Sequence, residues 1–225
     1  MRKSKAPAFA QLPPEVRNQL EKLKSTILLS AAKKRIRSIL FVSYNHGEGA
    51  STVARNFAQS MAQDKRYKTL LVDANTRTPS LQASGIDPDN GTVTFSGLFT
   101  EGLETVSLPK PQNGANLTLI PGGQTAHHPS QVFNHRRFGE FIASAKKLYH
   151  FVLFDSSPLG KYYDSVVLGS HMDGVVLVAE AEKTQLHELK WAKQLLDDRQ
   201  IPVLGVVLNK RRFWIPSFIY ERVFA

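Results

Sequence analysis

The sequence predicts an α/β fold, in which a mostly parallel sheet is covered by helices on both faces. Three observations support this prediction. Several short runs are apolar throughout, as is typical of parallel strands buried on both faces. Segments with helical spacing separate several of these runs, and such alternation favours right-handed crossover connections. Polar residues follow four of the runs directly, at the edge of the sheet where ligands of such folds bind.

The predicted strands and helices follow in order along the chain. The strands are residues 38–44, 69–74, 117–122, 151–156, 174–180 and 202–209. The helices are residues 13–29, 51–64 and 184–198, each with apolar residues at helical spacing and the first with proline at its start. Between the second and third strands, residues 82–116 are rich in Gly, Asp, Asn and Thr, so we expect loops there with at most one short helix.

Length and composition predict a single folded domain. The chain has 225 residues, of which 42% are hydrophobic, enough to bury a core. We expect a flexible basic tail over residues 1–12, the folded domain over 13–212 and an aromatic, basic tail over 213–225. The aromatic groups of this last tail either pack back on the domain or dock on a membrane or partner. Pro216 would interrupt a long amphipathic helix there.

Charge and cysteine content narrow the class of protein. Lysine and arginine outnumber the acids by 29 to 19, which fits either an anionic partner or an ordinary basic surface. The absence of cysteine excludes disulfides, thiol nucleophiles and cysteine-ligated metals. No run reaches the roughly 18 apolar residues of a membrane span, and no apolar run follows the basic start. We therefore expect a cytoplasmic protein.

The segment after the first strand has the pattern of a phosphate-binding loop. Its glycines let the backbone curl so that N–H groups point inward, and a hydroxyl residue opens the following helix, where it can hold Mg²⁺. The residues of this cradle are Gly47, Glu48, Gly49, Ala50, Ser51 and Thr52. The sequence therefore predicts a P-loop NTPase-like domain.

The same loop lacks its lysine. Ala50 stands at the lysine position, and Tyr44 replaces the first glycine. The lost charge removes a phosphate contact worth roughly 1.5–3 kcal/mol in binding, and more in a transition state where charge develops. Weak nucleotide binding is compatible with this loop, whereas phosphoryl transfer is disfavoured. Arg55, one helical turn further on, either substitutes for the lysine or is an ordinary surface arginine.

Five segments together resemble a known family. In chain order they are GEGAST, LLVDANTRTPSL, FVLFDSSP, DGVVLVAE and VLGVVLNK. This set, spread over about residues 15–212, resembles the bacterial tyrosine kinases (BY-kinases) of capsule and exopolysaccharide synthesis. That family belongs to a wider group with the chromosome-partitioning and division-site ATPases. The resemblance implies ATP or ADP with Mg²⁺ as ligands, and the missing lysine makes their binding weak or absent.

The resemblance also implies roles for individual residues. The loop glycines with Ser51 and Thr52 would contact the phosphates and Mg²⁺. Asp155 would be the metal-proximal Walker B carboxylate, and Asp73 would polarise the acceptor or bind the metal indirectly. These two are the catalytic candidates if the chain is active. The other reading of Asp155 is a strand-end carboxylate that caps a turn. Arg77 belongs to the family's D-x-D-x-R-x-P motif, and Asn209 would lie near the base.

The sequence departs from the family pattern at further positions. Asn75 replaces the second aspartate of the D-x-D motif, and only Tyr220 stands where active members have a tyrosine cluster. The ring-forming helix motif E-x-x-R-x-x-R is represented by Asn18, Glu21 and Lys24. The chain could therefore still form a homo-oligomer, but the motif that builds the family's ring is degenerate.

These departures favour a degenerate, pseudokinase-like member of the family. It would act as a regulatory or scaffold subunit of exopolysaccharide biosynthesis and export, peripheral at the inner membrane. Its partner would be the cytoplasmic end of a Wzz-like inner-membrane polysaccharide copolymerase, and no nucleic acid is expected. One alternative is an active ATP-dependent protein-tyrosine kinase or ATPase with another phosphate-binding cation. Another is a positioning ATPase on DNA or membrane, although Asn45 stands where that branch carries lysine.

Overall fold

The computed structural model describes residues 12–75, 77–78, 94–99, 108–109, 116–123, 132–133 and 136–211. Nearly all of the two predicted tails, including Tyr220, lies outside the described residues, as does most of the segment 82–116. Within the described part of the chain, no helix is both long and apolar enough to cross a bilayer.

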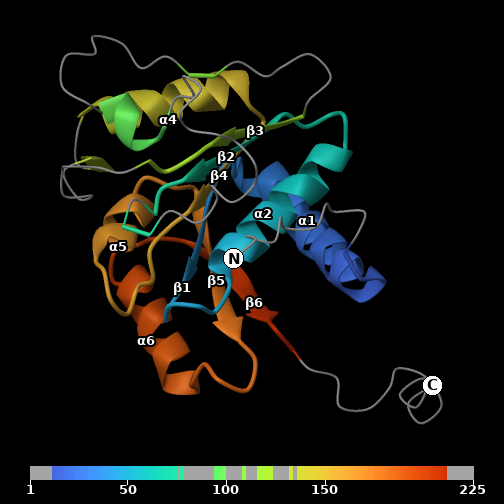
Figure 1. The fold of residues 1–225 in the computed structure, drawn as a ribbon, viewed down its shortest axis with the longest axis vertical. Helices are drawn as coiled ribbons and strands as arrows, with labels where there is room; N and C mark the ends of the chain where they lie inside the picture. Colours follow the sequence, from blue (N-terminus) through green and yellow to red (C-terminus); the bar gives the residue numbers. More distant parts are fainter. Residues whose placement is uncertain are drawn as a thin grey trace, which may run out of the picture.

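The core of the fold is a six-stranded sheet. The strands are β1 Ser38–Ser43, β2 Thr69–Asp73, β3 Leu117–Ile120, β4 Phe151–Asp155, β5 Gly174–Glu180 and β6 Val203–Asn209. They lie in the order β3-β2-β4-β1-β5-β6, and every neighbouring pair is parallel (Figure 1). The central strands β1, β2 and β4 are buried along their whole length. The predicted α/β fold with a parallel sheet is therefore confirmed.

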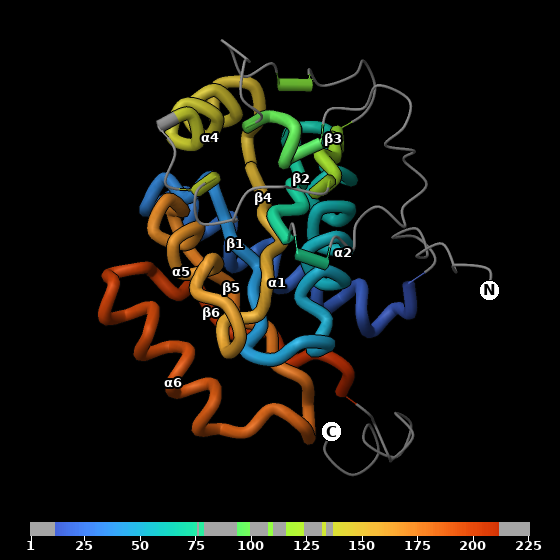
Figure 2. The backbone as a smooth tube through the Cα atoms, turned by 60° about the vertical axis from the view of Figure 1, so that its left-hand side comes forward, coloured from blue at the N-terminus to red at the C-terminus, as the bar shows by residue number. Residues whose placement is uncertain are grey.

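Helices cover both faces of this sheet. On one side lie α1 Pro14–Lys34 and α2 Ala50–Gln63. On the other side lie α4 Arg136–Leu148, α5 Asp164–Gly169 and α6 Leu186–Asp197 (Figure 1, Figure 2). A 3₁₀ turn, η3, spans Ser96–Phe99 within the segment that was predicted as loops. The first helix is longer than predicted, because it continues to Lys34.

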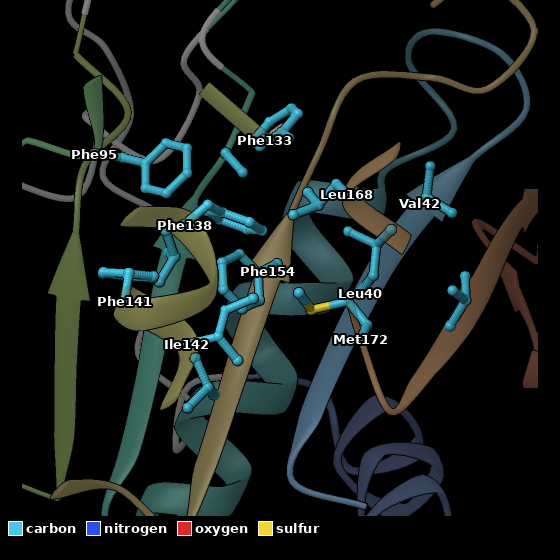
Figure 3. Close-up of a cluster of buried hydrophobic side chains, with 14 of the residues drawn as sticks. Leu40, Val42, Phe95, Phe133, Phe138, Phe141, Ile142, Phe154, Leu168 and Met172 are labelled. Atoms are coloured by element: carbon cyan, nitrogen blue, oxygen red, sulfur yellow. The ribbon is translucent and has the colours of Figure 1, made fainter. Parts of the chain in front are cut away.

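Sequence reasoning missed α4 and α5. Helix α4 did carry a readable signal, since Phe138, Phe141, Ile142 and Ala145 recur at helical spacing and are all buried. These residues pack with Phe154 of β4 in the larger of two apolar clusters (Figure 3). Helix α5 has six residues, too few to show a periodic pattern.

The second apolar cluster lies under α1 and α2. Phe41 of β1 meets Phe57 of α2 with ring centroids 5.4 Å apart. Burying one such side chain contributes about 2–3 kcal/mol, so this layer fixes α2 firmly against the sheet. The phosphate loop joins β1 to α2 directly, and both of its ends are therefore held by the core.

Two positions of the expected ring motif lie against α2 of the same chain. The buried Lys24 amine donates to the Ser60 carbonyl at 3.3 Å, and the Ser60 hydroxyl donates to the Glu21 carboxylate at 2.7 Å. Lys24 and Glu21 also form an ion pair at 3.5 Å. The charge that Lys24 retains at the motif's last position is thus used in the packing of α1 on α2.

Candidate functional site

The loop between β1 and α2 has the backbone of a phosphate cradle. Gly47 and Gly49 have positive φ angles of 87° and 95°, a region that favours glycine. Gly49 is the N-cap of α2 and no side chain caps the helix, so its first N–H groups are available to an anion. A Cβ added at Gly49 would lie 2.2 Å from Asn209 Nδ2, which leaves no room for a side chain.

Glu48 fastens this loop from within. Its side chain is 1% exposed, and its carboxylate accepts a hydrogen bond from the Asn45 backbone N–H at 3.0 Å. It also accepts one from the Thr184 hydroxyl at 2.5 Å, across the connection between β5 and α6. Glu48 was assigned to the cradle from sequence, and its side chain is occupied in holding the loop's shape.

The end of β6 closes the other side of the loop. Asn209 Nδ2 donates to the Glu48 carbonyl at 2.9 Å. The next residue, Lys210, donates from its Nζ to the Gly47 carbonyl at 2.6 Å and pairs with the Glu180 carboxylate at 3.0 Å. This hydrogen bond from Lys210 lowers the pKa of Glu180, and Lys183 adds to the effect. Sequence reasoning missed Lys210 as a loop neighbour.

Two buried carboxylates lie side by side next to the loop. Asp73 ends β2 and Asp155 ends β4, and the two residues are partners in the strand register. Both are fully buried. The Ala74 N–H donates to the Asp155 carbonyl at 2.8 Å, which ties the two strand ends together. The structure therefore brings together the two residues that the sequence analysis named as catalytic candidates.

Asn75 is built into this edge as a neutral amide. Its side-chain oxygen accepts hydrogen bonds from the Ser157 hydroxyl at 2.9 Å and from the Thr78 N–H at 3.2 Å. Its amide nitrogen donates to the Thr78 hydroxyl at 3.1 Å. Its backbone N–H donates to Asp73 Oδ1 at 3.1 Å. Asn75 thus organises the turn after β2 without adding charge.

Arg77, in the turn after β2, contacts the start of α5 and the segment before it. Its Nε pairs with the buried carboxylate of Asp164 at 2.7 Å, and its guanidinium stacks on the Tyr162 ring at 4.3 Å from the centroid. Both contacts tie the turn after β2 to the segment after β4. The structure gives Arg77 this bridging position, and its predicted contact with a cofactor stays a prediction.

The remaining cradle residues lie at the start of α2. Ala50 is buried, Ser51 is partly buried and Thr52 is exposed. The loop and first turn, residues 45–54, contain no lysine or arginine, and Arg55 directly after them is partly buried. The backbone therefore fits a phosphate group, and the roles of Ser51 and Asp155 as Mg²⁺ ligands stay a prediction, whereas residues 45–54 supply no lysine or arginine to neutralise the outer phosphates.

Comparison with known proteins gives one family. No family model matches the chain. The chain is 30% identical over 188 residues to the putative tyrosine-protein kinase CapB of Staphylococcus aureus, covering 84% of this chain and 81% of CapB. It is 28% identical over 189 residues to the tyrosine-protein kinase CpsD of Streptococcus agalactiae, covering 84% and 80% of the two chains.

Solved structures agree with this assignment. The chimerical protein CapA2B2 superposes with a TM-score of 0.75 at 25% identity, over 91% of this chain and 88% of that one. The BceF tyrosine kinase domain superposes with a TM-score of 0.77 at 20% identity, over 91% of this chain and 82% of that one. The cell division ATPase MinD of Pyrococcus furiosus superposes with a TM-score of 0.63 at 24% identity, over 83% of this chain and 78% of that one. The last two, at under 25% identity, show that the fold is shared and no more.

Proposed function

The chain belongs to the family of bacterial tyrosine-protein kinases, and from this membership we propose that it is a degenerate member with a regulatory or scaffold role. Its process would be the biosynthesis and export of an exopolysaccharide. The observation that carries the proposal is Ala50. It places a buried methyl group at the start of α2 where the family has lysine, although the loop backbone has the shape of a phosphate cradle.

The energetic consequence of Ala50 supports a binding role over catalysis. A lysine next to phosphates contributes roughly 1.5–3 kcal/mol to ground-state binding. Its contribution grows where charge accumulates on the transferred phosphoryl group, because the cation then meets more negative charge. The backbone N–H groups at the start of α2 remain available for phosphate. We therefore infer that ATP or ADP with Mg²⁺ binds weakly or not at all. Phosphoryl transfer should be impaired more strongly than nucleotide binding.

Asn75 supports the same inference from the acceptor side. A neutral amide cannot take up a proton from a tyrosine hydroxyl at neutral pH as a carboxylate can. The oxygen and nitrogen of its side chain also form hydrogen bonds with Ser157 and Thr78, so the amide holds the turn together. Asp73 and Asp155 keep their places, and we propose that they would serve as catalytic groups only if a cation is supplied by other means.

The proposed partner is the cytoplasmic end of an inner-membrane polysaccharide copolymerase. The match to the chimerical protein CapA2B2 supports a role next to a second protein, because a chimera joins parts of more than one protein in one chain. The chain would then be peripheral at the inner membrane through this contact. Co-purification of the tagged chain with a copolymerase from solubilised membranes is the measurement that checks it.

A transfer assay tests the central claim. The purified chain is incubated with Mg²⁺ and ATP labelled on its γ-phosphate, alone and with a tyrosine-rich peptide. We expect no label above background on either. Robust labelling that disappears in Asp155→Ala but persists in Asp198→Ala, an exposed carboxylate directly after α6, would refute the proposal that the chain is a degenerate kinase.

A second candidate function is favoured by Lys210. Its Nζ lies on the Gly47 carbonyl, so a cation does sit at the loop although it comes from β6. We infer that an active kinase or ATPase of this sequence would use Lys210, ahead of Arg55, as its substitute cation. ATP titrations of wild type, Lys210→Ala and Arg55→Ala separate the cases. Tight wild-type binding that only Lys210→Ala abolishes would establish this alternative.

A further inference from the structure

The edge of the sheet opposite the phosphate loop carries three basic segments. Residues 33–37 precede β1, residues 64–68 precede β2 and residues 146–150 precede β4. These strands are neighbours in the order β2-β4-β1, and all run in the same direction. The three segments therefore lie side by side, and we call them, together with Asp173, the amino-edge patch.

Hydrogen bonds join the three segments into one surface. The His150 N–H donates to the Lys68 carbonyl at 2.8 Å, and the Lys68 N–H donates to His150 Nδ1 at 3.0 Å. Arg37 reaches across from the start of β1 and donates to the His150 carbonyl at 3.3 Å and the Tyr149 carbonyl at 2.6 Å. The patch is thus a fixed feature of the fold.

Most of the chain's net charge is concentrated here. The patch holds nine cations and two carboxylates, Asp64 and Asp173, a net charge of +7 against +10 for the whole sequence. Six of the cations are exposed and form no ion pair within the part of the chain that the structure describes: Lys33, Lys34, Arg35, Lys65, Lys68 and Lys147. Such a density of unpaired charge on one surface favours an extended anionic partner.

Exposed leucines distinguish between the anionic partners. Leu148 lies inside the patch and is 39% exposed, and Leu29, one turn before Lys33 on α1, is 67% exposed. Leucine next to lysine suits the interface of a bilayer, where apolar side chains enter between headgroups. Base stacking needs a free aromatic face, but the Tyr67 ring makes T-shaped contacts with His150 and Phe151, and the Arg66 guanidinium lies over it at 5.4 Å from the centroid. These contacts favour lipid over nucleic acid.

We propose that the amino-edge patch binds the surface of an anionic lipid bilayer directly. This contact is independent of nucleotide and of any copolymerase, so it goes beyond the proposed function. It also sets an orientation, because the phosphate loop lies at the opposite edge of the sheet and would face away from the bilayer. Each lysine near an anionic leaflet contributes about a fivefold factor in affinity.

Co-sedimentation of the full chain with lipid vesicles tests the proposal. We expect binding to vesicles of phosphatidylglycerol and phosphatidylcholine, little binding to phosphatidylcholine alone, and weakening by added salt. The triple variant Lys33→Gln, Lys34→Gln, Lys68→Gln should bind about a hundredfold more weakly, since three such factors multiply. Circular dichroism should show this variant folded, because Lys33, Lys34 and Lys68 are all exposed.

A matched triple variant controls for net charge. Lys22→Gln, Lys161→Gln, Lys190→Gln removes the same charge from exposed positions outside the patch and should change binding less than about threefold. Equal loss in the two triple variants would overturn the proposal, because binding would then follow total charge or another segment. Binding to duplex DNA that depends on the patch, with no binding to vesicles, would also overturn it and assign the surface to phosphodiesters.

Discussion

The two edges of the sheet are each fastened by a carboxylate, but with different partners. At the carboxyl edge Glu48 is held by neutral donors, the Asn45 N–H and the Thr184 hydroxyl. At the amino edge Asp173 accepts hydrogen bonds at 2.8 Å from the Arg37 N–H and from the Lys146 ammonium. Glu48 is thus held by neutral donors, whereas Asp173 is held by a cation, and the cation nearest the loop, Lys210, contacts the Gly47 carbonyl. This difference explains how the cradle keeps its shape without its lysine.

The largest effect is expected where the loop backbone itself is altered. Gly49→Ala forces a Cβ onto a residue at φ 95° and against Asn209 Nδ2. The backbone strain and the lost hydrogen bond to the Glu48 carbonyl should together cost about 3 kcal/mol of unfolding free energy, measured by urea denaturation. The matched variant is Gly139→Ala, at the fourth residue of α4, where an added Cβ meets nothing within 4 Å. It should stabilise by about 0.5–1 kcal/mol, and an equal loss in both variants would contradict this account.

The variant Glu48→Gln tests whether the stability of the phosphate loop depends on the buried carboxylate of Glu48. The amide places an N–H₂ group among groups that are themselves donors, so at least one hydrogen bond to a charged acceptor is lost. We expect a loss of about 2.5 kcal/mol in unfolding free energy. The exposed Glu15→Gln on α1 should stay within about 0.5 kcal/mol of wild type. If Glu48→Gln were equally silent, the carboxylate would not hold the loop.

The sequence predicted the sheet well because its signal is local. Runs that are apolar on both faces identify central parallel strands, and their shared direction places Asp73 and Asp155 at the same edge of the sheet. That the two are neighbours depends on the strand order, which the sequence did not predict. The roles of Glu48 and Lys210 could not be found this way. Lys210 meets Gly47 across 163 positions of sequence, and the inward direction of Glu48 depends on Thr184. Helix α4 was a readable signal that was overlooked.

Ala50→Lys tests whether the missing positive charge is the only reason why the cradle binds ATP weakly. If the backbone is already in place, the new ammonium should raise ATP affinity by about 2 kcal/mol, close to thirtyfold, in calorimetric titrations with Mg²⁺. Gln63→Lys adds the same charge at the far end of α2 and should leave affinity unchanged within about twofold. A thirtyfold gain in both variants would point to general electrostatics, and no gain in Ala50→Lys would mean that the loop geometry is also lost.

The smallest effect is expected at the amino edge, and it should depend on pH. Burial opposes the charge of Asp173, but hydrogen bonds from Lys146 and from the Ser38 and Arg37 N–H groups outweigh it and hold its pKa below the ordinary value. A depressed pKa in the folded state contributes stability that is present above the unfolded pKa, about 4, and is lost as pH falls through the folded value.

Asp173→Asn should therefore cost about 1.5 kcal/mol of unfolding free energy at pH 7, measured by urea denaturation. The difference from wild type should shrink as the pH falls below about 4, since a protonated aspartate resembles the amide. Asp198→Asn, exposed at the end of α6, supplies the control and should show no such trend. A difference that stays constant down to pH 2 would mean that Asp173 acts through shape and not through its charge. The contrast between Glu48, which is held by neutral donors, and Asp173, which is held by a cation, would then no longer hold.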